Sequence, residues 1–194
     1  DADYPELLRQ TENPPAALFV IGNIDLLWHP QIAIVGSRHP TPGGRENAKQ
    51  FARTFAESGW CVTSGLAEGI DTSAHGGALS VPDNSGRATV AVVATGLDVI
   101  YPAQNRGLAE IIARHGAIIS EHPPGTPPLK EHFPSRNRII AGLSLGCLVV
   151  EAAERSGALI TARLAAEIGR EVFAIPGSIH NPMTRGCHKL IRQG

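Results

Sequence analysis

The segment Gln31-Ile32-Ala33-Ile34-Val35-Gly36-Ser37-Arg38 decides the fold class. Its apolar run does not alternate with polar residues, which is typical of a strand buried on both faces of a sheet. Thr41 and Pro42 then form an N-cap and first-turn pair, and apolar residues recur at spacings of three and four as far as Gly59. The segment therefore predicts a buried strand, a small-residue loop and a helix.

The same alternation of apolar runs and helical stretches continues along the chain. Further strands are predicted at Trp60–Ser64, Ala88–Thr95, Ala117–Ser120, Cys147–Ala152 and Glu171–Pro176, with a possible one at Leu18–Ile21. Helices are predicted at Ile70–Ser80, Ala103–His115, Pro134–Ser144 and Leu159–Ile168, and a short one near Lys189. Buried strands joined by helices predict an α/β fold, namely an extended Rossmann-like, doubly wound, mostly parallel sheet flanked by helices. Residues 1–30 are expected to pack as an N-terminal extension on a single domain, 31–194, which is expected to be part of a longer protein.

Composition limits the functional classes. The chain has 194 residues, 42% hydrophobic residues and a formal net charge of -1, so it is neither disordered nor broadly basic. Binding of nucleic acid would therefore need a local cationic patch. The sequence contains neither an apolar run long enough for a membrane span nor a signal-peptide pattern. Cys61, Cys147 and Cys187 are odd in number and widely spaced, which predicts buried free thiols and a reducing compartment.

Small residues follow the predicted strands. In a doubly wound sheet, ligands bind where the strands end. Gly36-Ser37, Ser64-Gly65 and Ser156-Gly157 all lie at such ends. Glycine lets a phosphate approach the backbone closely, and amides and hydroxyls donate to it, so these loops predict an anion site. The loop Gly36–Thr41 lacks the G-x-G-x-x-G dinucleotide pattern, and the histidines lack metal spacing, so neither a cofactor nor a metal is expected.

A second candidate site combines a ring, an amide and three cations: Lys130, Phe133, Arg136, Asn137 and Arg138. An exposed ring beside cations can stack a base while the cations hold phosphates. Alternatively, Phe133 belongs to the core and the arginines pair with Glu121 or Glu151. Arg136 and Arg138 point to different faces of the predicted helix, so one of them is expected to be structural.

Three further features have two interpretations each. Arg38 is either a solvent-facing residue after a tight turn or an anion ligand. Asp71 is most simply a charge at a helix N-terminus, although His75 one turn later would allow a catalytic pair. Ser156 is a plausible N-cap whose neighbouring amides could also bind an anion.

Thirteen segments, in this order, carry a resemblance to a known family: Tyr4-Pro5, Ile34–Arg38, Ser64–Ala67, Gly69–Asp71, Ala74-His75, Gly96–Asp98, Tyr101-Pro102, Ser120-Glu121, Phe133-Pro134, Arg136–Ser144, Val150–Ala152, Ser156-Gly157 and Pro176-Gly177. Through them the whole chain resembles the Rossmann-like domain of DNA-processing protein A, the DprA or Smf family. The resemblance implies a cytoplasmic bacterial protein that binds single-stranded DNA and loads the RecA recombinase onto it in natural transformation and recombination. It also implies a homodimer without catalytic activity. The flanking domains of many members do not fit in this chain.

The resemblance implies a DNA pocket built from Gly36, Ser37, Arg38, the Ser64-Gly65 loop, Lys130, Phe133 and Arg136-Asn137-Arg138. In the resulting mechanism Arg38, Lys130 and one helix arginine neutralise phosphates while Phe133 stacks a base. The alternative is a nucleotide hydrolase of the related lysine-decarboxylase-like phosphoribohydrolase type, with Glu151 as its carboxylate. Those enzymes resemble one another through a P-G-G-x-G-T-x-x-E motif, where this chain has Ser156-Gly157. A third possibility is a nucleotide-sensing or protein-interaction module.

Overall fold

The computed structural model describes residues 4–82 and 89–194 and contains a seven-stranded sheet in the order β1-β5-β4-β3-β2-β6-β7. The strands are β1 (Phe19–Gly22), β2 (Gln31–Val35), β3 (Cys61–Ser64), β4 (Thr89–Val92), β5 (Ala117–Ser120), β6 (Gly146–Val149) and β7 (Glu171–Ala174). β1 runs antiparallel to β5 at one edge, and every other neighbouring pair is parallel. The predicted fold class is therefore confirmed, although the start of β4 predicted at Ala88 lies outside the described residues.

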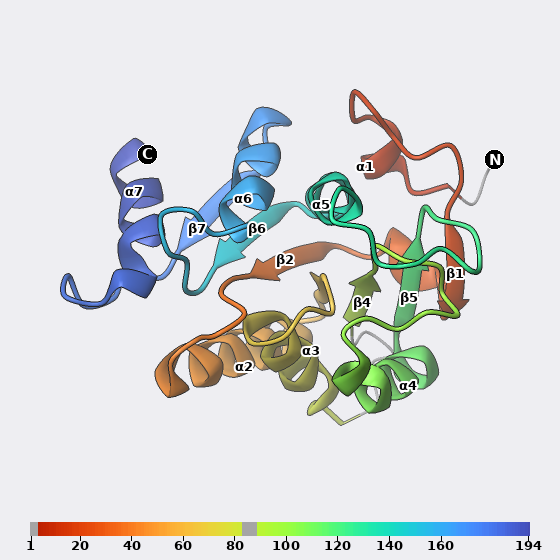
Figure 1. Cartoon of the computed structure of the whole chain (residues 1–194), viewed down its shortest axis with the longest axis horizontal. Helices are drawn as coiled ribbons and strands as arrows, with labels where there is room; N and C mark the ends of the chain where they lie inside the picture. The colour runs from red at the N-terminus through yellow and green to blue at the C-terminus, as the bar shows by residue number, and fades with distance from the viewer. Residues whose placement is uncertain (1–3, 83–88) are drawn as a thin grey trace.

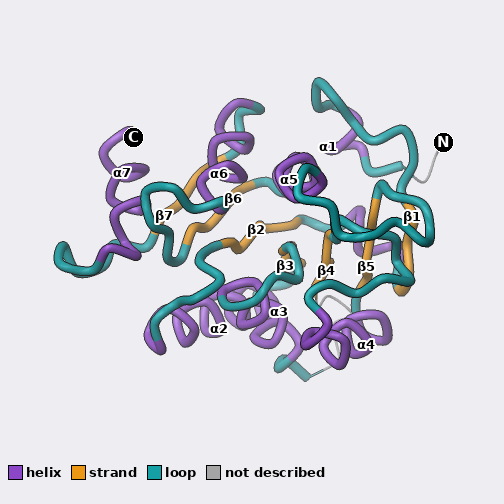
Figure 2. Tube along the Cα trace, viewed as in Figure 1, coloured by secondary structure: helices purple, strands orange, loops and turns teal. Residues whose placement is uncertain are grey.

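Helices cover both faces of this sheet. They are α1 (Glu6–Arg9), α2 (Pro42–Glu57), α3 (Ile70–Leu79), α4 (Arg106–His115), α5 (His132–Leu143), α6 (Ala158–Glu167) and α7 (Arg185–Gln193). Figure 1 shows α2, α3 and α4 on one face and α1, α5 and α6 on the other, and Figure 2 shows the strands between these two layers. The predicted helix Ala103–His115 begins as a 3-10 turn, Ala103–Asn105, before α4. This arrangement is the doubly wound one expected of βαβ units.

Local interactions explain how the first strand–helix–strand unit, β2-α2-β3, forms. Every residue of β2 is buried, as a central parallel strand requires. Thr41 caps α2 as predicted, because its Oγ1 accepts a 3.0 Å hydrogen bond from the Gly44 amide, and Pro42 occupies the first turn. Gly59 has a φ of 85°, which lets the chain reverse into β3.

The strand order creates a switch point between β2 and β6. From β2 the chain moves outward through β3, β4 and β5, and it then returns to place β6 on the other side of β2. The loops after β2 and β6 therefore diverge to opposite faces of the sheet and leave a crevice between them. Ligands of open α/β sheets bind at such a crevice.

The N-terminal residues add to this frame. α1 lies on α5, where Leu8 is fully buried and a Cβ on Gly142 would lie 2.7 Å from the Leu8 Cδ1 atom. The apolar run Leu18–Ile21 predicts the strand β1, whereas no pattern predicts α1, which has only four residues. Residues 4–30 thus contribute a strand to the same sheet and a helix to its α5 face.

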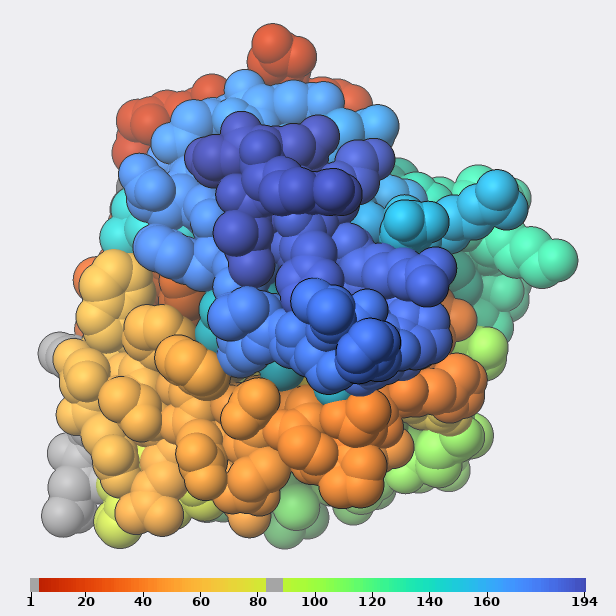
Figure 3. Space-filling model, turned by 90° about the vertical axis from the view of Figure 1, so that its left-hand side faces the viewer, coloured from red at the N-terminus to blue at the C-terminus, as the bar shows by residue number. Residues whose placement is uncertain are grey.

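The other end of the sheet is formed by β7 and α7. Figure 3 looks onto this end, where the C-terminal segment, in dark blue, lies above the α2 segment, in orange. Cys61, Cys147 and Cys187 are free and buried, as predicted. Within residues 4–82 and 89–194, no helix has the length and hydropathy that crossing a membrane would need.

Candidate nucleic-acid interface

A cavity of about 750 Å³ lies at the switch point. The loops after β2 and β6, the start of α5 and Tyr101 form its walls. Nine of the residues predicted from the sequence line it: Gly36, Ser37, Arg38, Lys130, Phe133, Arg136, Asn137, Ser156 and Gly157. The fold thus brings both candidate sites, the small-residue loops and the cationic helix, into one cavity.

Phe133 stands in the wall of this cavity, between a cation and a second ring. The Arg38 guanidinium carbon lies 5.7 Å from the centre of the Phe133 ring, a cation–π distance. The Tyr101 ring lies on Phe133 as well, with ring centres 5.6 Å apart and planes inclined by 56°. Phe133 is only partly buried. Its ring therefore belongs to the cavity surface rather than to the hydrophobic core.

Arg136 differs from the other cations because it is buried, with 5% of its surface exposed. Its Nη1 donates to the carbonyl oxygen of Gly65 at 2.6 Å and also to that of Val92. Burial lowers the pKa of Arg136 to about 10, while nearby Asp71 opposes this shift. Arg136 therefore stays charged at neutral pH and ties α5 to the ends of β3 and β4.

The Asp71 carboxylate accepts hydrogen bonds from the loop amides that were predicted to bind a phosphate. Its Oδ2 accepts hydrogen bonds from the amides of Gly65 at 3.1 Å and Ala67 at 3.3 Å. Burial raises the pKa of Asp71, whereas Arg136 and these two amides act in the opposite direction. The predicted phosphate cradle after β3 is therefore filled by a side chain of the protein itself.

The glycines of these loops also make room for protein atoms. A Cβ on Gly36 would lie 2.6 Å from Cγ1 of Ile70, and one on Gly65 would lie 2.6 Å from Nη2 of Arg136. The Ser37 amide donates to the carbonyl oxygen of Glu151 at 2.6 Å. Internal packing therefore already requires glycine at both positions, and the close approach of a phosphate stays a prediction.

His75 forms no pair with Asp71 and has a partner of its own. Its Nδ1 lies 2.7 Å from Oγ1 of Thr89, and the Thr89 hydroxyl donates to the carbonyl oxygen of Val62, so His75 Nδ1–H is the donor. Complete burial, and to a lesser extent Arg136, lower the pKa of His75 to about 3. The imidazole is neutral and structural, and the catalytic alternative for Asp71 and His75 has no geometric support.

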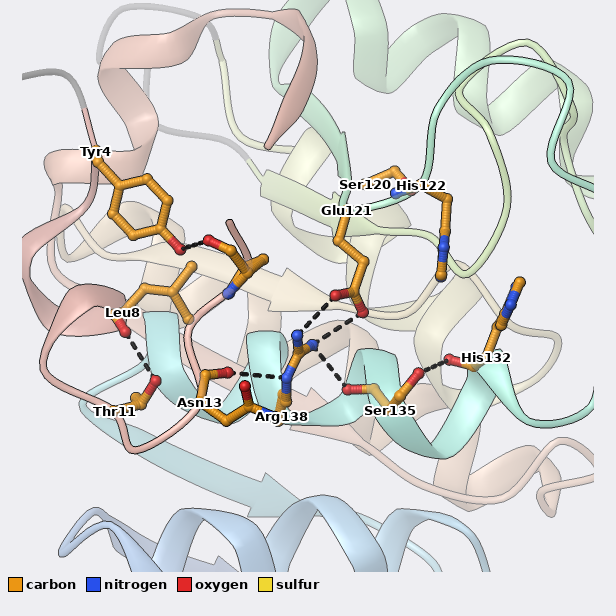
Figure 4. A network of polar contacts seen from close by, with 11 residues as sticks. Tyr4, Leu8, Thr11, Asn13, Ser120, Glu121, His122, His132, Ser135 and Arg138 are labelled. Atoms are coloured by element: carbon orange, nitrogen blue, oxygen red, sulfur yellow. Dashed lines mark hydrogen bonds and ion pairs between the residues drawn. The ribbon is translucent and has the colours of Figure 1, made fainter. Parts of the chain in front are cut away.

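Arg138 and Ser64 do not line the cavity. Arg138 points to the other side of α5, where Nη1 and Nη2 donate to the two carboxylate oxygens of Glu121 at 2.9 and 2.6 Å (Figure 4). Its Nε donates to the carbonyl oxygen of Asn13 at 3.0 Å, which fastens the N-terminal segment. Ser64 is buried and donates to the carbonyl oxygen of Ile34 at 2.7 Å. Arg138 matches the alternative in which one helix arginine pairs with Glu121.

Both oxygens of the Glu151 carboxylate also have hydrogen-bond donors within the protein. Its Oε2 accepts from the Thr41 amide at 2.9 Å and its Oε1 from the Thr41 hydroxyl at 2.5 Å. It is buried beside the first turn of α2, where a carboxylate also interacts favourably with the helix dipole. Glu151 thus stabilises the N-terminus of α2 and does not line the cavity.

Arg155 and Tyr101 also line the cavity and were not among the residues predicted for the site. Arg155 is exposed and lies directly before the predicted Ser156-Gly157 loop, so its position after β6 could have indicated it. Tyr101 reaches Phe133 only through the tertiary structure, and no local pattern reveals this contact. α6 begins at Ala158, one residue before the predicted range Leu159–Ile168, and its N-cap is Gly157 instead of Ser156. The Ser156 hydroxyl nevertheless accepts a hydrogen bond from the Ala158 amide at 3.3 Å.

The described part of the chain contains no group of three His, Cys, Asp or Glu side chains able to hold a metal. Fold and site together define a class: a doubly wound α/β protein with a cationic, aromatic cavity at the switch point of its sheet. The family model described as DNA recombination-mediator protein A matches residues 1–194. The chain belongs to this DprA/Smf family of DNA-processing proteins.

The relatives agree in sequence and in fold. The DNA processing protein DprA of Streptococcus pneumoniae is 47% identical over the whole chain, which covers 67% of that protein. Protein Smf of Escherichia coli is 50% identical over 98% of the chain, which spans 50% of that protein. The crystal structure of the S. pneumoniae protein matches with a TM-score of 0.93 over the whole chain and 67% of its own.

A second solved structure describes the single-stranded DNA binding mode of DNA processing protein A from Helicobacter pylori. It is 32% identical and matches with a TM-score of 0.89 over 98% of this chain and 85% of its own. The molybdenum cofactor binding protein of Rippkaea orientalis, 17% identical with a TM-score of 0.55, shares the fold alone.

Proposed function

We propose that this chain binds single-stranded DNA in the switch-point cavity and that it does so without catalysis. The observation that carries the proposal is the Arg38 guanidinium over the Phe133 ring, in a cavity that also holds Lys130. An aromatic face stacks a base, and cations beside it hold the flanking phosphates. The binding mode described for the H. pylori relative supports the same ligand here.

The charges of the cavity indicate which residues contact phosphates. Arg38, Lys130 and Arg155 are exposed and line the cavity, whereas Arg136 is buried near Asp71. We assign the phosphate contacts to the first three, and to Arg136 a positioning role. Three neutralised phosphates predict a slope of about -2 in a plot of log K against log salt, at about -0.7 per phosphate.

The remaining predicted residues divide in the same way. Gly36, Ser37, Asn137, Ser156 and Gly157 line the cavity and would contact the strand. Ser64, Gly65 and Arg138 would act indirectly, because they form hydrogen bonds with other protein atoms. The enzymatic alternative has less support, since both Glu151 oxygens bind Thr41.

The full proposal is that the protein loads RecA onto single-stranded DNA in the bacterial cytoplasm, as a homodimer. The description of its family as a recombination mediator supports the first part. Exposed apolar side chains at the β7 end, namely Phe173, Ile179 and Ile191, support association with another protein surface. Light scattering of the purified protein tests the dimer, and RecA filament assembly on DNA coated with single-strand binding protein tests the loading. A monomer, or assembly that the protein does not accelerate, would contradict these parts.

Titration of labelled single- and double-stranded oligonucleotides at several salt concentrations tests DNA binding. We expect a strong preference for single strands, which Arg38→Ala abolishes. Arg114→Ala is the matched control, because Arg114 is exposed on α4 and does not line the cavity. Equal affinity for both kinds of strand, or equal loss in both variants, would refute the proposed site. Phe133→Ala should weaken binding roughly 5- to 150-fold, since stacking contributes about 1–3 kcal/mol.

A further inference from the structure

The imidazole rings of His122 and His132 form a histidine stack, with ring centres 4.0 Å apart and planes inclined by 18° (Figure 4). His122 lies just after β5, and His132 is the first residue of α5. The stack therefore joins the two ends of the loop between β5 and α5. His132 lies in the chain between Lys130 and Phe133, which both line the DNA cavity.

The His122 side of the stack is anchored to the sheet. The His122 amide donates a 3.0 Å hydrogen bond to Oγ of Ser120, and this hydroxyl donates to the carbonyl oxygen of Thr95 at 2.6 Å. The preceding residue, Glu121, binds both terminal nitrogens of Arg138. His122 is thus a fixed ring against which the first residue of α5 packs.

The His132 side depends more on the stack itself. The His132 amide donates to the carbonyl oxygen of Leu129 at 3.1 Å, and the His132 carbonyl accepts from the Ser135 hydroxyl at 3.0 Å. Both of these hydrogen bonds stay within the same short segment of chain. The contact with His122 therefore adds a link between the first turn of α5 and the sheet.

The histidine stack favours neutral rings. Nε2 of His122 and Nδ1 of His132 are buried and have no hydrogen-bond partner within residues 4–82 and 89–194. A neutral ring can carry its proton on the other nitrogen. A protonated ring must place an N–H group at the buried nitrogen, which costs free energy without an acceptor. Protonation of both rings would also place two positive charges 4.0 Å apart, so acid should separate them.

The charged and titratable groups around the stack come from several segments. They are Glu121 after β5, Lys130, Glu131 and Arg138 at the start of α5, Tyr4 near Arg138, and Asp98, which accepts from the Gly125 amide of the same loop. Burial lowers the pKa of His122, and the His132 charge lowers it further, whereas Glu121 opposes them and Arg138 adds to them. Tyr4 stays neutral, because burial raises its pKa.

We propose that His122 and His132 are positioning residues for the DNA site: the neutral stack keeps Lys130 and Phe133 in place, and protonation separates the rings and weakens binding. This inference rests on the proposed binding of single-stranded DNA and adds a dependence on pH to it. Histidine titrates between about pH 5 and 8, so the change falls in mild acid. Because the neutral stack binds DNA better, bound DNA must in turn oppose protonation.

Titration of a labelled homothymidine oligonucleotide at constant ionic strength, at about pH 7.5 and about pH 5.5, tests the proposal. Thymine does not titrate in this range. We expect the wild-type affinity to fall roughly 5- to 150-fold in acid, the range for losing a base stacked on Phe133. A double variant, His122→Phe with His132→Phe, keeps two flat rings that bind no proton. It should match the wild-type affinity at the higher pH and keep it at the lower one.

His180→Gln is the matched control, because His180 is exposed and does not line the cavity. It should keep the wild-type pH dependence. His39 and His75 remain in every variant, so their contributions cancel in the comparison. A wild-type affinity that does not fall in acid, or an equal fall in the double variant, would overturn the role of the stack while leaving DNA binding intact. Absence of binding at the higher pH would overturn the proposed function as well.

Proton NMR of the wild-type protein gives a second test that needs no variant to fold. The Cε1–H resonance of His122 should titrate below about pH 6.5, the ordinary histidine value. A bound oligonucleotide should move this titration to still lower pH. A midpoint at or above the ordinary value, or one that DNA leaves unchanged, would contradict the proposal.

Discussion

Arg136 donates a 2.6 Å hydrogen bond to the carbonyl oxygen of Gly65, and the Gly65 amide in turn donates to Asp71. Two buried, oppositely charged side chains thus bind the amide and the carbonyl of the same residue, Gly65, beneath the cavity. Contacts within the protein therefore hold the cavity floor, where the Arg136 guanidinium lies near the Asp71 carboxylate.

Removing the Arg136 guanidinium should destabilise the protein strongly. Arg136→Met leaves Asp71 buried without its neighbouring cation and leaves two carbonyl oxygens without a donor, at a cost of about 3–5 kcal/mol in the free energy of unfolding. Urea denaturation measures this loss. Asp71→Asn in the Arg136→Met background should recover part of it. A loss below about 1 kcal/mol would show that Arg136 does not support the floor.

Arg155 should behave as a phosphate contact instead. Arg155→Ala removes one exposed cation from the cavity, so the salt slope should change from about -2 to about -1.4 while the free energy of unfolding stays the same. The measurement is binding of one oligonucleotide at several salt concentrations. Arg114→Ala serves as the control and should leave the slope unchanged. The same slope in both variants would remove Arg155 from the site.

Arg138 should matter for stability and not for DNA. Its pair with Glu121 is bidentate and mostly buried, with 23% and 17% of the side chains exposed, so Arg138→Met should cost about 1.5–3 kcal/mol. Arg53→Met, which breaks the exposed pair with Glu57, should cost less than about 1 kcal/mol. Oligonucleotide affinity of folded Arg138→Met should stay within about twofold of wild type. A tenfold loss would return Arg138 to the DNA site.

His75 should make the protein less stable in acid. Its pKa is lowered to about 3 in the folded state, against about 6.5 in an unfolded chain, so the unfolded state binds more protons as the pH falls. The stabilisation is complete above about pH 7 and is lost by about 1.4 kcal/mol per pH unit below about pH 6.5. Between about pH 7.5 and about pH 5 the loss should reach about 2 kcal/mol.

Urea denaturation of the wild-type protein and of His75→Gln across this pH range isolates the effect. The comparison cancels the other titrating groups, including Asp71, whose raised pKa acts in the opposite direction. His180→Gln, a change at an exposed histidine, should retain the wild-type dependence. Equal pH dependence in His75→Gln and wild type would show that His75 is not the responsible group.

Most of the fold could be predicted from the sequence because its signals are local. Unbroken apolar runs identified the buried strands, and Thr41 and Gly59 marked the ends of α2. The four-residue helix α1 could not be predicted, since it depends on the contact of Leu8 with α5.

The candidate site was predicted less completely. Strand-end loops and the cationic stretch identified the walls, because a parallel sheet brings its carboxyl ends together. Arg136 and Arg138 have different roles because they occupy different faces of α5 and contact different residues. Arg136 meets the ends of β3 and β4, and Arg138 meets Glu121, through contacts between residues far apart in the chain.

The crowding around Gly36 and Gly65 has a consequence for how mutational data on this protein should be interpreted. Saturation mutagenesis scored by survival or transformation would mark both positions as intolerant, and this intolerance would not by itself show a ligand contact. Their intolerance would arise from Ile70 and the Arg136 guanidinium, which occupy the space that a methyl group would need. Scoring each variant separately for protein abundance and for DNA retention would distinguish such steric positions from Arg38, Lys130 and Arg155, which should be depleted only in the second assay.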